Sequence, residues 1–448
     1  MAGFESELAG GRLLDRALLM FTGPVTRRIG PEKVARLAAV VDQGANGLGN
    51  VIALALLGRA LPAVDFGAVG TMIGLYYILA GFHRSAFVLI FTTSYRTGGT
   101  SIDDHRENST WWWLSLGAAV MLAAALGLAA LLVAAAPIAL SRISWTAQPL
   151  ALAMIVSPPM LAWEFARRWL YKVERADVVA VCSGANLVIQ VFAAWFVARH
   201  APTALTASLS WVLANSLAVL LALPWLMPTR PSWVTAIALV RENRATAGWF
   251  AATNVPYSVY SSASIVVWIG LFMNALATAV FTAARTLTNP AISLVSAIDS
   301  IDKPRAARAM AVEGAPGLLR VVRKTRLTIA AVTGLYLSLV SLFADRLTAV
   351  VFAGAYDGLG TEIRILAAGF FFFGLNLPSE TMMIVLRAGR TMLVVRFIAA
   401  ALSLCALWVG SSHGIRGMTI AFAVSQAVIL ILFQMAERGV LRKIQVQL

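Results

Sequence analysis

Long apolar segments recur along the whole sequence, and they limit the folds open to it. An apolar helix of about 20 residues crosses a bilayer, and within lipid only helices and closed barrels satisfy their own backbone hydrogen bonds. Of the 448 residues 59% are hydrophobic and only 13% are charged, about half the charged share of a soluble protein. The sequence therefore predicts an all-α polytopic membrane protein with about twelve transmembrane helices. The expected spans centre on 38–60, 66–93, 112–137, 147–169, 178–198, 205–227, 246–271, 275–299, 327–344, 361–386, 391–411 and 416–435.

Basic residues give the orientation of these spans. An even number of spans leaves both termini on one side, and placing them in the cytoplasm puts Lys and Arg inside at a ratio of about five to one. The residues expected outside are Arg59, Arg142, Arg199, Arg346 and Arg416. Because loops beside an anionic membrane face are basic, the net charge of +15 requires no nucleic-acid partner. The basic segment 301–326 is expected to be a connecting loop with no fold of its own.

The twelve spans are expected to form two six-helix bundles with cytoplasmic termini. We place a cytoplasmic or interfacial segment at 1–33, the N-terminal bundle at 34–232, the C-terminal bundle at 233–436 and a cytoplasmic tail at 437–448. A weak internal repeat agrees with two parallel halves. It pairs Lys33, Arg36 and Asn46 with Arg241, Arg244 and Asn254.

The first 33 residues carry charges throughout and do not resemble a cleavable signal. Leu14, Leu18 and Phe21 recur at helical spacing among basic residues. This pattern fits a short helix on the membrane surface or a disordered basic tail, and the sequence does not decide between them.

Polar and charged residues also occur inside the predicted spans, where they are costly unless they face a protein interior or a water-filled cavity. Arg84 and Arg285 are the hardest to explain structurally, because each lies far from one end of an apolar span. Asp42, Asn46 and Asn50 share one helical face. The candidate substrate-binding residues are Arg84, Arg285, His83, Asn289, Asn46, Asn254, Glu380 and Arg396, and Asp42 is the candidate for ion coupling.

Structural roles compete with functional ones at several of these positions. Asn residues in membrane helices commonly form interhelical hydrogen bonds. Arg396 could extend to the cytoplasmic surface, and Asp42 could pair with Arg36. Glu164 and the nearby Arg167–Arg168 pair are expected to form an ion pair at the cytoplasmic end of their span.

The sign of the deep charges indicates the cargo. Arg84 and Arg285, with His83 nearby, stand against Asp42 and Glu380, which gives a mildly positive passage. Guanidinium groups bind phosphate and carboxylate in bidentate fashion, so a passage of this kind favours an anionic cargo.

The sequence lacks the motifs of the common enzyme classes. It has no GxxxxGK[ST] phosphate loop and no HExxH, CxxC or GxSxG motif. Its two cysteines lie in apolar stretches and its four histidines are scattered, so no metal-ligand set is formed. We therefore expect a protein that is not an enzyme, with no catalytic residues, no metal and no cofactor.

Three segments resemble the polysaccharide-transporter flippases, which belong to the multidrug/oligosaccharidyl-lipid/polysaccharide (MOP) flippase superfamily. The first is Asp42-Gln-Gly-Ala-Asn46, and the second is Ala-Leu-Leu-Gly-Arg59-Ala-Leu-Pro-Ala-Val-Asp65-Phe-Gly67. The third is Pro158-Pro159 followed by Trp163-Glu-Phe-Ala-Arg-Arg168. The turn after Arg59 reads Ala-Leu-Pro, where the family usually has Leu-Gly, so the subfamily is not assigned.

This resemblance implies a two-lobed bundle in a bacterial cytoplasmic membrane. It would move polyprenyl-pyrophosphate-linked glycans to the outer leaflet for lipopolysaccharide or exopolysaccharide biosynthesis, by alternating access. Arg84 and Arg285 are the positions that could contact the pyrophosphate or acidic sugars. Its partners would be the lipid-linked glycan, membrane lipids, and a polysaccharide polymerase with other assembly proteins.

Other functions remain open on the sequence alone. A cation-coupled multidrug exporter of the MATE type shares the superfamily, but cationic drugs favour an acidic cavity. A major-facilitator transporter also has twelve spans, yet the loop Tyr95–Asp104 lacks that family's Gly-x-x-x-Asp-Arg-x-Gly-Arg-Arg motif. A scaffold or a glycan polymerase would be favoured by a large external domain, and none is predicted.

Overall fold

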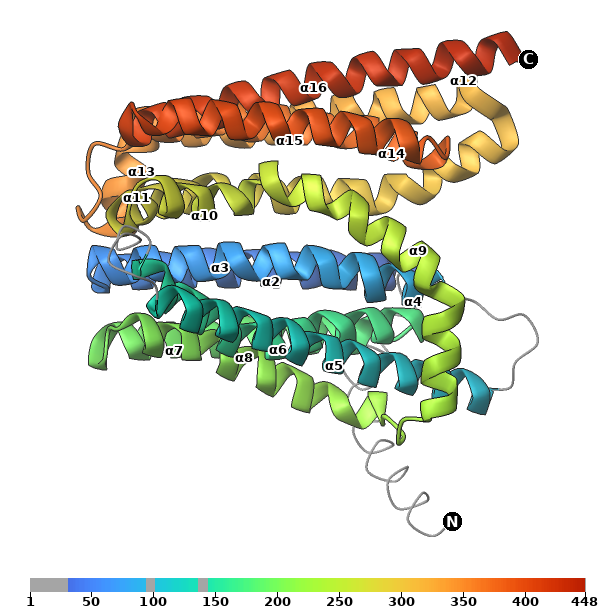
Figure 1. The fold of residues 1–448 in the computed structure, drawn as a ribbon, viewed down its shortest axis with the longest axis horizontal. Coiled ribbons are helices and arrows are strands. Elements are labelled where there is room, and N and C mark those ends of the chain that lie inside the picture. The colour runs from blue at the N-terminus through green and yellow to red at the C-terminus, as the bar shows by residue number, and fades with distance from the viewer. Residues whose placement is uncertain (1–30, 94–100, 136–143, 448) are drawn as a thin grey trace.

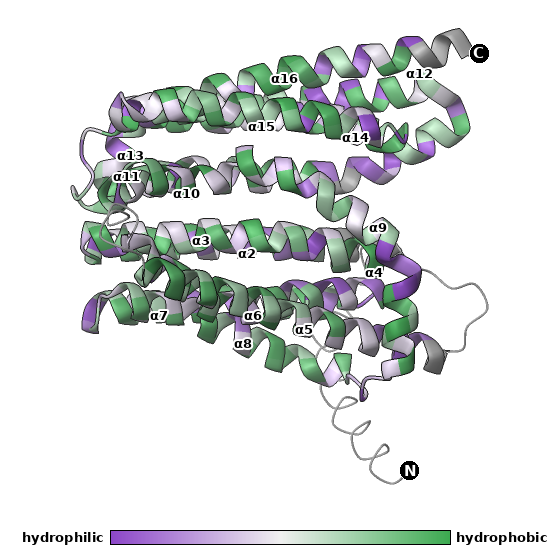
Figure 2. Cartoon of the chain, in the orientation of Figure 1, coloured by the Kyte–Doolittle hydropathy of each residue, from purple (hydrophilic) through white to green (hydrophobic). Residues whose placement is uncertain are grey.

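The computed structural model describes residues 31–93, 101–135 and 144–447, and within these ranges the chain forms helices without any strand (Figure 1). Apolar residues cover the middle of the helices and polar residues gather toward both ends (Figure 2). That banding is the pattern of helices that cross a membrane. The predicted N-terminal segment 1–33 lies outside the described residues except where the first described helix begins.

The first six spans form one bundle, the lower lobe in Figure 1. In it α2 packs along α7, α5 packs along α6, and both α6 and α7 contact α8. The elements are α2 (Pro31–Ala60), α3 (Ala63–His83) with its continuation through the π-helix η1 (Arg84–Val88) and α4 (Leu89–Thr93), α5 (Ser101–Ala134), α6 (Ala147–Lys172), α7 (Ala176–His200) and α8 (Ala204–Leu226).

The remaining helices form the second bundle, the upper lobe in Figure 1. In it α14 packs against α12 and α16, and α15 packs against α9 and α16. The elements are α9 (Trp233–Tyr260), α10 (Ser262–Phe272), α11 (Ala275–Thr288), α12 (Pro290–Leu342), α13 (Ala344–Phe352), α14 (Gly360–Val385), α15 (Gly389–Ser411) and α16 (Gly414–Gln447).

The predicted fold class is confirmed. Among the described residues ten helices are long and apolar enough to cross a membrane, or eleven when α9 and α10, which meet at a 58° bend, count as one span. The 53-residue α12 covers two predicted spans, because it reverses direction at Gly314, whose φ of 67° favours glycine. Since α11 leads into the first arm of α12, about twelve spans result.

The segment 301–326 is helical, so the prediction of an unstructured loop is wrong. Both arms of α12 continue past the apolar spans and pack on each other. Ala306 of the first arm, Leu318 and Val322 of the second arm, and Met382 of α14 form one buried cluster. Pro316 begins the second arm just after the turn. Basic residues dominate the composition of this segment and mask the apolar stripe that makes it fold.

The two lobes pack closely at one end through a line of glycines on α3. A side chain at Gly67 would collide with the Ala275 carbonyl of α11, one at Gly70 with Thr282, and one at Gly74 with the Ala263 carbonyl of α10. Small residues at this spacing let helix backbones approach within a membrane. At the same end Arg59 donates to the carbonyls of Val350 and Val351, at 2.6 Å each.

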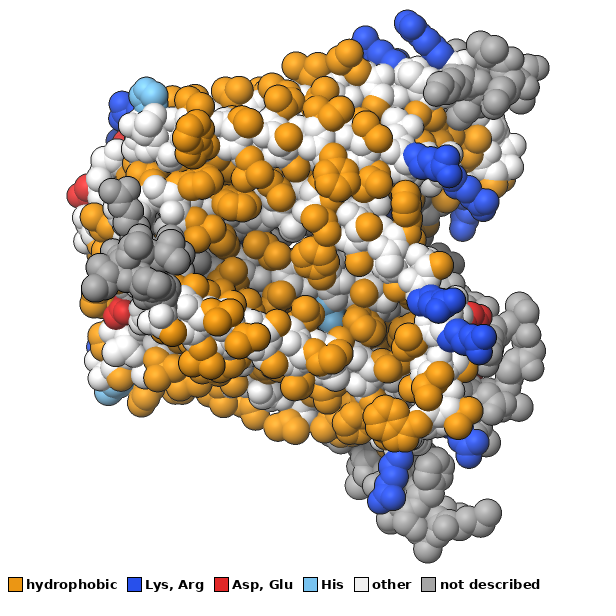
Figure 3. All heavy atoms as spheres, viewed as in Figure 1, with side chains coloured by type: hydrophobic (Ala, Val, Ile, Leu, Met, Phe, Trp, Pro, Cys, Tyr) orange, Lys and Arg blue, Asp and Glu red, His pale blue; other side chains and the backbone are white. Residues whose placement is uncertain are grey.

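Burial along α3 shows where the lobes separate. Every residue from Phe66 to Gly74 is buried, whereas exposure begins near Tyr77 and Arg84 is exposed. The eighth span behaves alike, buried from Phe281 to Thr288 and partly exposed beyond. Basic side chains gather at the right-hand end of the molecule, where the surface is notched between the lobes (Figure 3). The positive-inside rule makes this end cytoplasmic, so the lobes meet outside and part toward the cytoplasm.

Candidate functional site

Arg285 lies where the lobes meet, near the end of α11. The residue is 8% exposed, and its side chain forms no ion pair or hydrogen bond with any residue that the structure describes; the Nε atom is buried without an acceptor. A cavity of about 20 Å³ adjoins it, lined also by Asn50 of α2, Gly70 of α3 and Asn289. This volume holds about one water molecule. A buried unpaired guanidinium is costly, so the position is suited to a site that an anion completes.

Polar groups surround Arg285 without neutralising it. Asn50 accepts hydrogen bonds from Gln190 and Trp211, at 3.0 and 2.9 Å, and donates to the Asn46 carbonyl at 3.1 Å. The described lining of the cavity contains Thr282 and Thr286 but no carboxylate. The sequence pointed to Arg285 and Asn289, which lie together here. It did not identify Gln190 and Trp211, whose only signal was a polar group inside an apolar span.

Arg84 lies in the part of the second span that is open. It begins the π-helix η1, a distortion that is frequent at functional sites, and its side chain is 55% exposed. Its Nη2 atom is 3.4 Å from Oε1 of Glu164. Glu164 also pairs with Arg167 and Arg168, at 3.1 and 3.2 Å, which confirms the predicted ion pair on α6. Glu164 is thus shared among three guanidinium groups, and Arg84 is the most exposed of the three, so its charge is only partly compensated and accessible to a further anion.

Asp42 is fully buried, and both oxygens of its carboxylate accept hydrogen bonds. It accepts from Nη2 of Arg167 at 2.5 Å, from the Tyr171 hydroxyl at 2.9 Å and from the Ser183 hydroxyl at 2.5 Å. Asn46 donates to it at 3.0 Å. Its ionic partner is therefore Arg167 of α6; the Arg36 side chain lies outside the described part of the chain. Asp42 and Asn46 thus belong to a network inside the N-terminal lobe.

Glu380 and Arg396 form the corresponding network in the C-terminal lobe. Their Oε2 and Nη2 atoms are 2.8 Å apart, and Arg396 also donates to the Thr253 carbonyl at 3.1 Å. The guanidinium lies 5.2 Å from the centre of the Tyr257 ring, and Asn376 donates to Glu380 at 3.2 Å. With a side chain only 11% exposed, Arg396 does not extend to the cytoplasmic surface.

The last two candidates lie apart from Arg285. His83 is 1% exposed, contacts Phe87, and shares a 2.8 Å hydrogen bond with Ser115 of α5, so it faces the interior of its own lobe. Asn254 of α9 packs across the lobes against Gly81 of α3, and its amide nitrogen has no acceptor among the described residues. The candidate site therefore consists of Arg285 with Asn289 and Asn50, and of Arg84 toward the cytoplasm.

The sequence matches no family model and no curated protein. Solved structures do match. An inward-facing multidrug resistance MATE family transporter of the MOP superfamily is 14% identical, with a TM-score of 0.64 over 91% of this chain and 99% of that one. An outward-facing structure of such a transporter gives 0.55 at 13% identity, over 92% and 97%.

Two further structures extend the comparison. A mutant of the Vibrio cholerae MATE transporter VcmN gives a TM-score of 0.61 at 14% identity, over 92% of this chain and 97% of that one. A MOP superfamily transporter from Pyrococcus furiosus gives 0.57 at 15% identity, over 92% and 96%.

Fold and site together define a multi-pass membrane protein of two helical lobes with a positively charged junction between them. The chain has the fold of the MATE family transporters of the MOP superfamily.

Proposed function

We propose that this protein is a flippase in a bacterial cytoplasmic membrane. It moves polyprenyl-pyrophosphate-linked glycans from the cytoplasmic to the outer leaflet, for the assembly of surface or exported polysaccharide. The observation that carries the proposal is Arg285, a buried residue at the junction of two lobes whose guanidinium has no counter-charge among the residues that the structure describes. A pyrophosphate supplies the missing negative charge in the bidentate geometry that guanidinium groups prefer.

The balance of buried charge supports an anionic cargo. Asp42 and Glu380 each lie within 3 Å of an arginine nitrogen, and Glu164 contacts three arginines. None of these carboxylates is left to receive a cationic drug. The Pyrococcus furiosus structure is described as having a binding pocket of reverse polarity that suggests a different function, so pocket charge is a reasonable guide to cargo within this fold.

The arrangement of the lobes supports alternating access. The glycine contacts of α3 seal the outer half, while Arg84 lies in the half that opens to the cytoplasm. A headgroup entering from the cytoplasmic leaflet would meet Arg84 first and Arg285 at the closed end. Separation of the helices that pack at Gly67, Gly70 and Gly74 would then release the headgroup to the outer side. A polysaccharide polymerase and other assembly proteins would receive the product.

A cation-coupled multidrug exporter is the second candidate, because the fold fits it equally well. A buried carboxylate on the first span, Asp42, is the observation in its favour. Its 2.5 Å contact with Arg167 opposes this, since protonation of Asp42 would remove the nearer of the two carboxylates that pair with this buried arginine.

Flipping of a lipid-linked sugar in proteoliposomes distinguishes the two functions. The wild-type protein should flip the pyrophosphate-linked lipid, Arg285→Ala should lose most of the rate, and Arg285→Lys should keep part of it. Arg199→Ala, at an exposed arginine beside Trp195 on α7, is the matched control and should remain active. Gradient-driven export of a cationic dye, with no flipping by the wild-type protein, would favour the exporter.

A further inference from the structure

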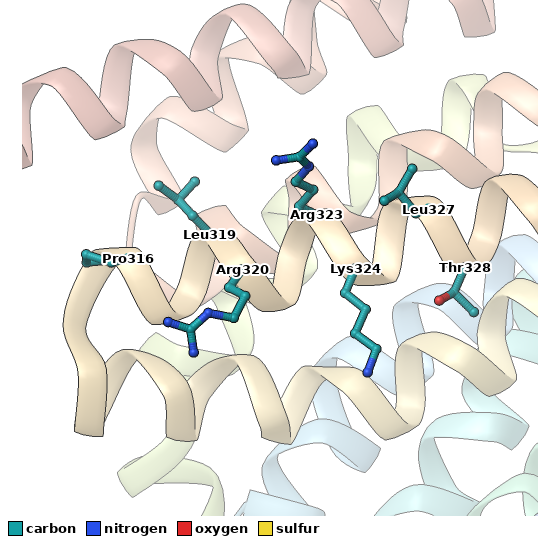
Figure 4. A pocket seen from close by; sticks show the side chains of 7 residues that line it. All are labelled: Pro316, Leu319, Arg320, Arg323, Lys324, Leu327 and Thr328. Carbon is teal, nitrogen blue, oxygen red and sulfur yellow. The ribbon is translucent and has the colours of Figure 1, made fainter.

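The second arm of α12 carries a basic pocket at its cytoplasmic end, separate from the junction of the lobes. The pocket has a volume of about 490 Å³, and Figure 4 shows Arg320 and Lys324, one turn apart, projecting to one side of the helix that lines it and Arg323 projecting to the other side. Leu319 and Leu327 also line the pocket. The site thus combines three cations with apolar contact area.

The positive charge of this pocket is largely uncompensated. The side chains of Arg323 and Lys324 form no ion pair or hydrogen bond with any residue in the described ranges, and both residues are exposed. Arg320 pairs with Glu313 at 2.8 Å, but both side chains are exposed, so this pair contributes little. Neighbouring basic residues are more fully matched, in the pairs Lys303–Asp299, Arg305–Asp302 and Arg326–Glu437.

The position of the pocket indicates what kind of anion it receives. Leu327, 63% exposed, begins the apolar stretch of the ninth span, one turn beyond Arg323 and Lys324. The basic side chains therefore lie at the level where an apolar helix leaves the membrane, which is the depth of lipid headgroups. A ligand that fits would carry an anionic group at the level of Arg323 and Lys324 and an apolar group at the level of Leu327.

We propose that this pocket binds the phosphate headgroup of an anionic phospholipid in the cytoplasmic leaflet. The phosphate lies over the face of α12 between Arg323 and Lys324, which flank the pocket from its two sides, and Leu327 contacts the start of an acyl chain. Free phosphate offers the same anionic chemistry, but it leaves the apolar part of the pocket unused. The proposal does not depend on the cargo, because neither Arg84 nor Arg285 lines this pocket.

Native mass spectrometry of the purified full-length chain tests the proposal, with phosphatidylglycerol as the probe and phosphatidylcholine as the neutral comparison. The variant is Arg323→Gln with Lys324→Gln. Each basic residue near an anionic surface strengthens binding about fivefold, so the double variant should retain phosphatidylglycerol about 25-fold more weakly. Thermal unfolding of both proteins checks that the two exposed substitutions leave the fold intact.

The matched control is Arg305→Gln with Arg308→Gln, which removes the same charge from the first arm of the same helix, outside the pocket. This variant should bind phosphatidylglycerol as the wild type does. Equal losses in the two double variants would show that general surface charge attracts the lipid, and would overturn the proposal. Competition by inorganic phosphate at the same affinity would also overturn it, by showing a free-phosphate site.

Discussion

Replacing Arg285 by methionine should make the protein more stable and inactive. Arg285 is 8% exposed and its guanidinium is unpaired among the described residues, so the folded protein bears a desolvation cost that methionine, of similar length, removes. Replacing buried charges by well-packed apolar groups often stabilises proteins by about 1–4 kcal/mol, and we take about 2 kcal/mol. For 448 residues, with an unfolding entropy of about 2.1 cal/mol/K per residue, this corresponds to a rise of about 2 °C in Tm.

Arg167→Met is the control with the opposite sign. Arg167 pairs with Asp42 and Glu164. Glu164 also pairs with Arg84 and Arg168, so the loss of Arg167 leaves the buried Asp42 as the one of these two carboxylates without an ionic partner among the described residues. Breaking a buried pair costs about 3–5 kcal/mol, which by the same conversion lowers Tm by about 3–5 °C. The assay is thermal unfolding in one detergent for all three proteins, together with flipping in proteoliposomes.

The ligand response completes this prediction. A pyrophosphate-bearing lipid at 100 times its Kd should stabilise the wild-type protein by about 2.7 kcal/mol and should leave Arg285→Met unchanged. A lower Tm for Arg285→Met than for the wild type would refute the reasoning, because it would show that Arg285 is already paired within the protein.

Three further predictions concern the glycine contacts of α3, the buried carboxylate of Asp42 and the topology. Gly70→Leu should abolish flipping at normal abundance, because the side chain collides with Thr282, whereas Gly44→Ala, with open space around it, should remain active in the same assay. Asp42→Asn should slow a gradient-driven transport cycle if Asp42 couples ions, and an unchanged gradient dependence would remove that role. Reporter fusions at residues 100 and 201 should report the cytoplasmic and the outer side respectively, and signals from a single side would contradict the orientation.

Much of the fold was predictable because a bilayer imposes simple rules. Apolar length marks each span, and the distribution of basic residues marks the sides. The helical hairpin of α12 was missed because its apolar stripe at Ala306 and Leu318 is diluted by Arg and Lys. The length rule applies only to helices that cross the bilayer, so it could not identify a helix in the segment 301–326. The high charge of this segment was therefore interpreted as lack of structure.

The site was predictable only in part. The sequence marked Arg285 as deeply placed. It could not show that the side chain has no partner in the described part of the chain, because that depends on every helix around it. The pairing of Asp42 with Arg167 joins residues on α2 and α6 that no local pattern connects. His83 and Arg84 are adjacent, yet one faces α5 and the other is exposed. Spacing tells which residues share a face of one helix, and packing decides what that face meets.

A structure of the full-length protein in a lipid nanodisc, with a pyrophosphate-linked lipid bound, tests the central claim most directly. We predict phosphate oxygens at hydrogen-bond distance, about 2.8 Å, from the Arg285 guanidinium, with the small cavity beside it enlarged. A headgroup bound elsewhere, with Arg285 still enclosed and unpaired, would contradict the account.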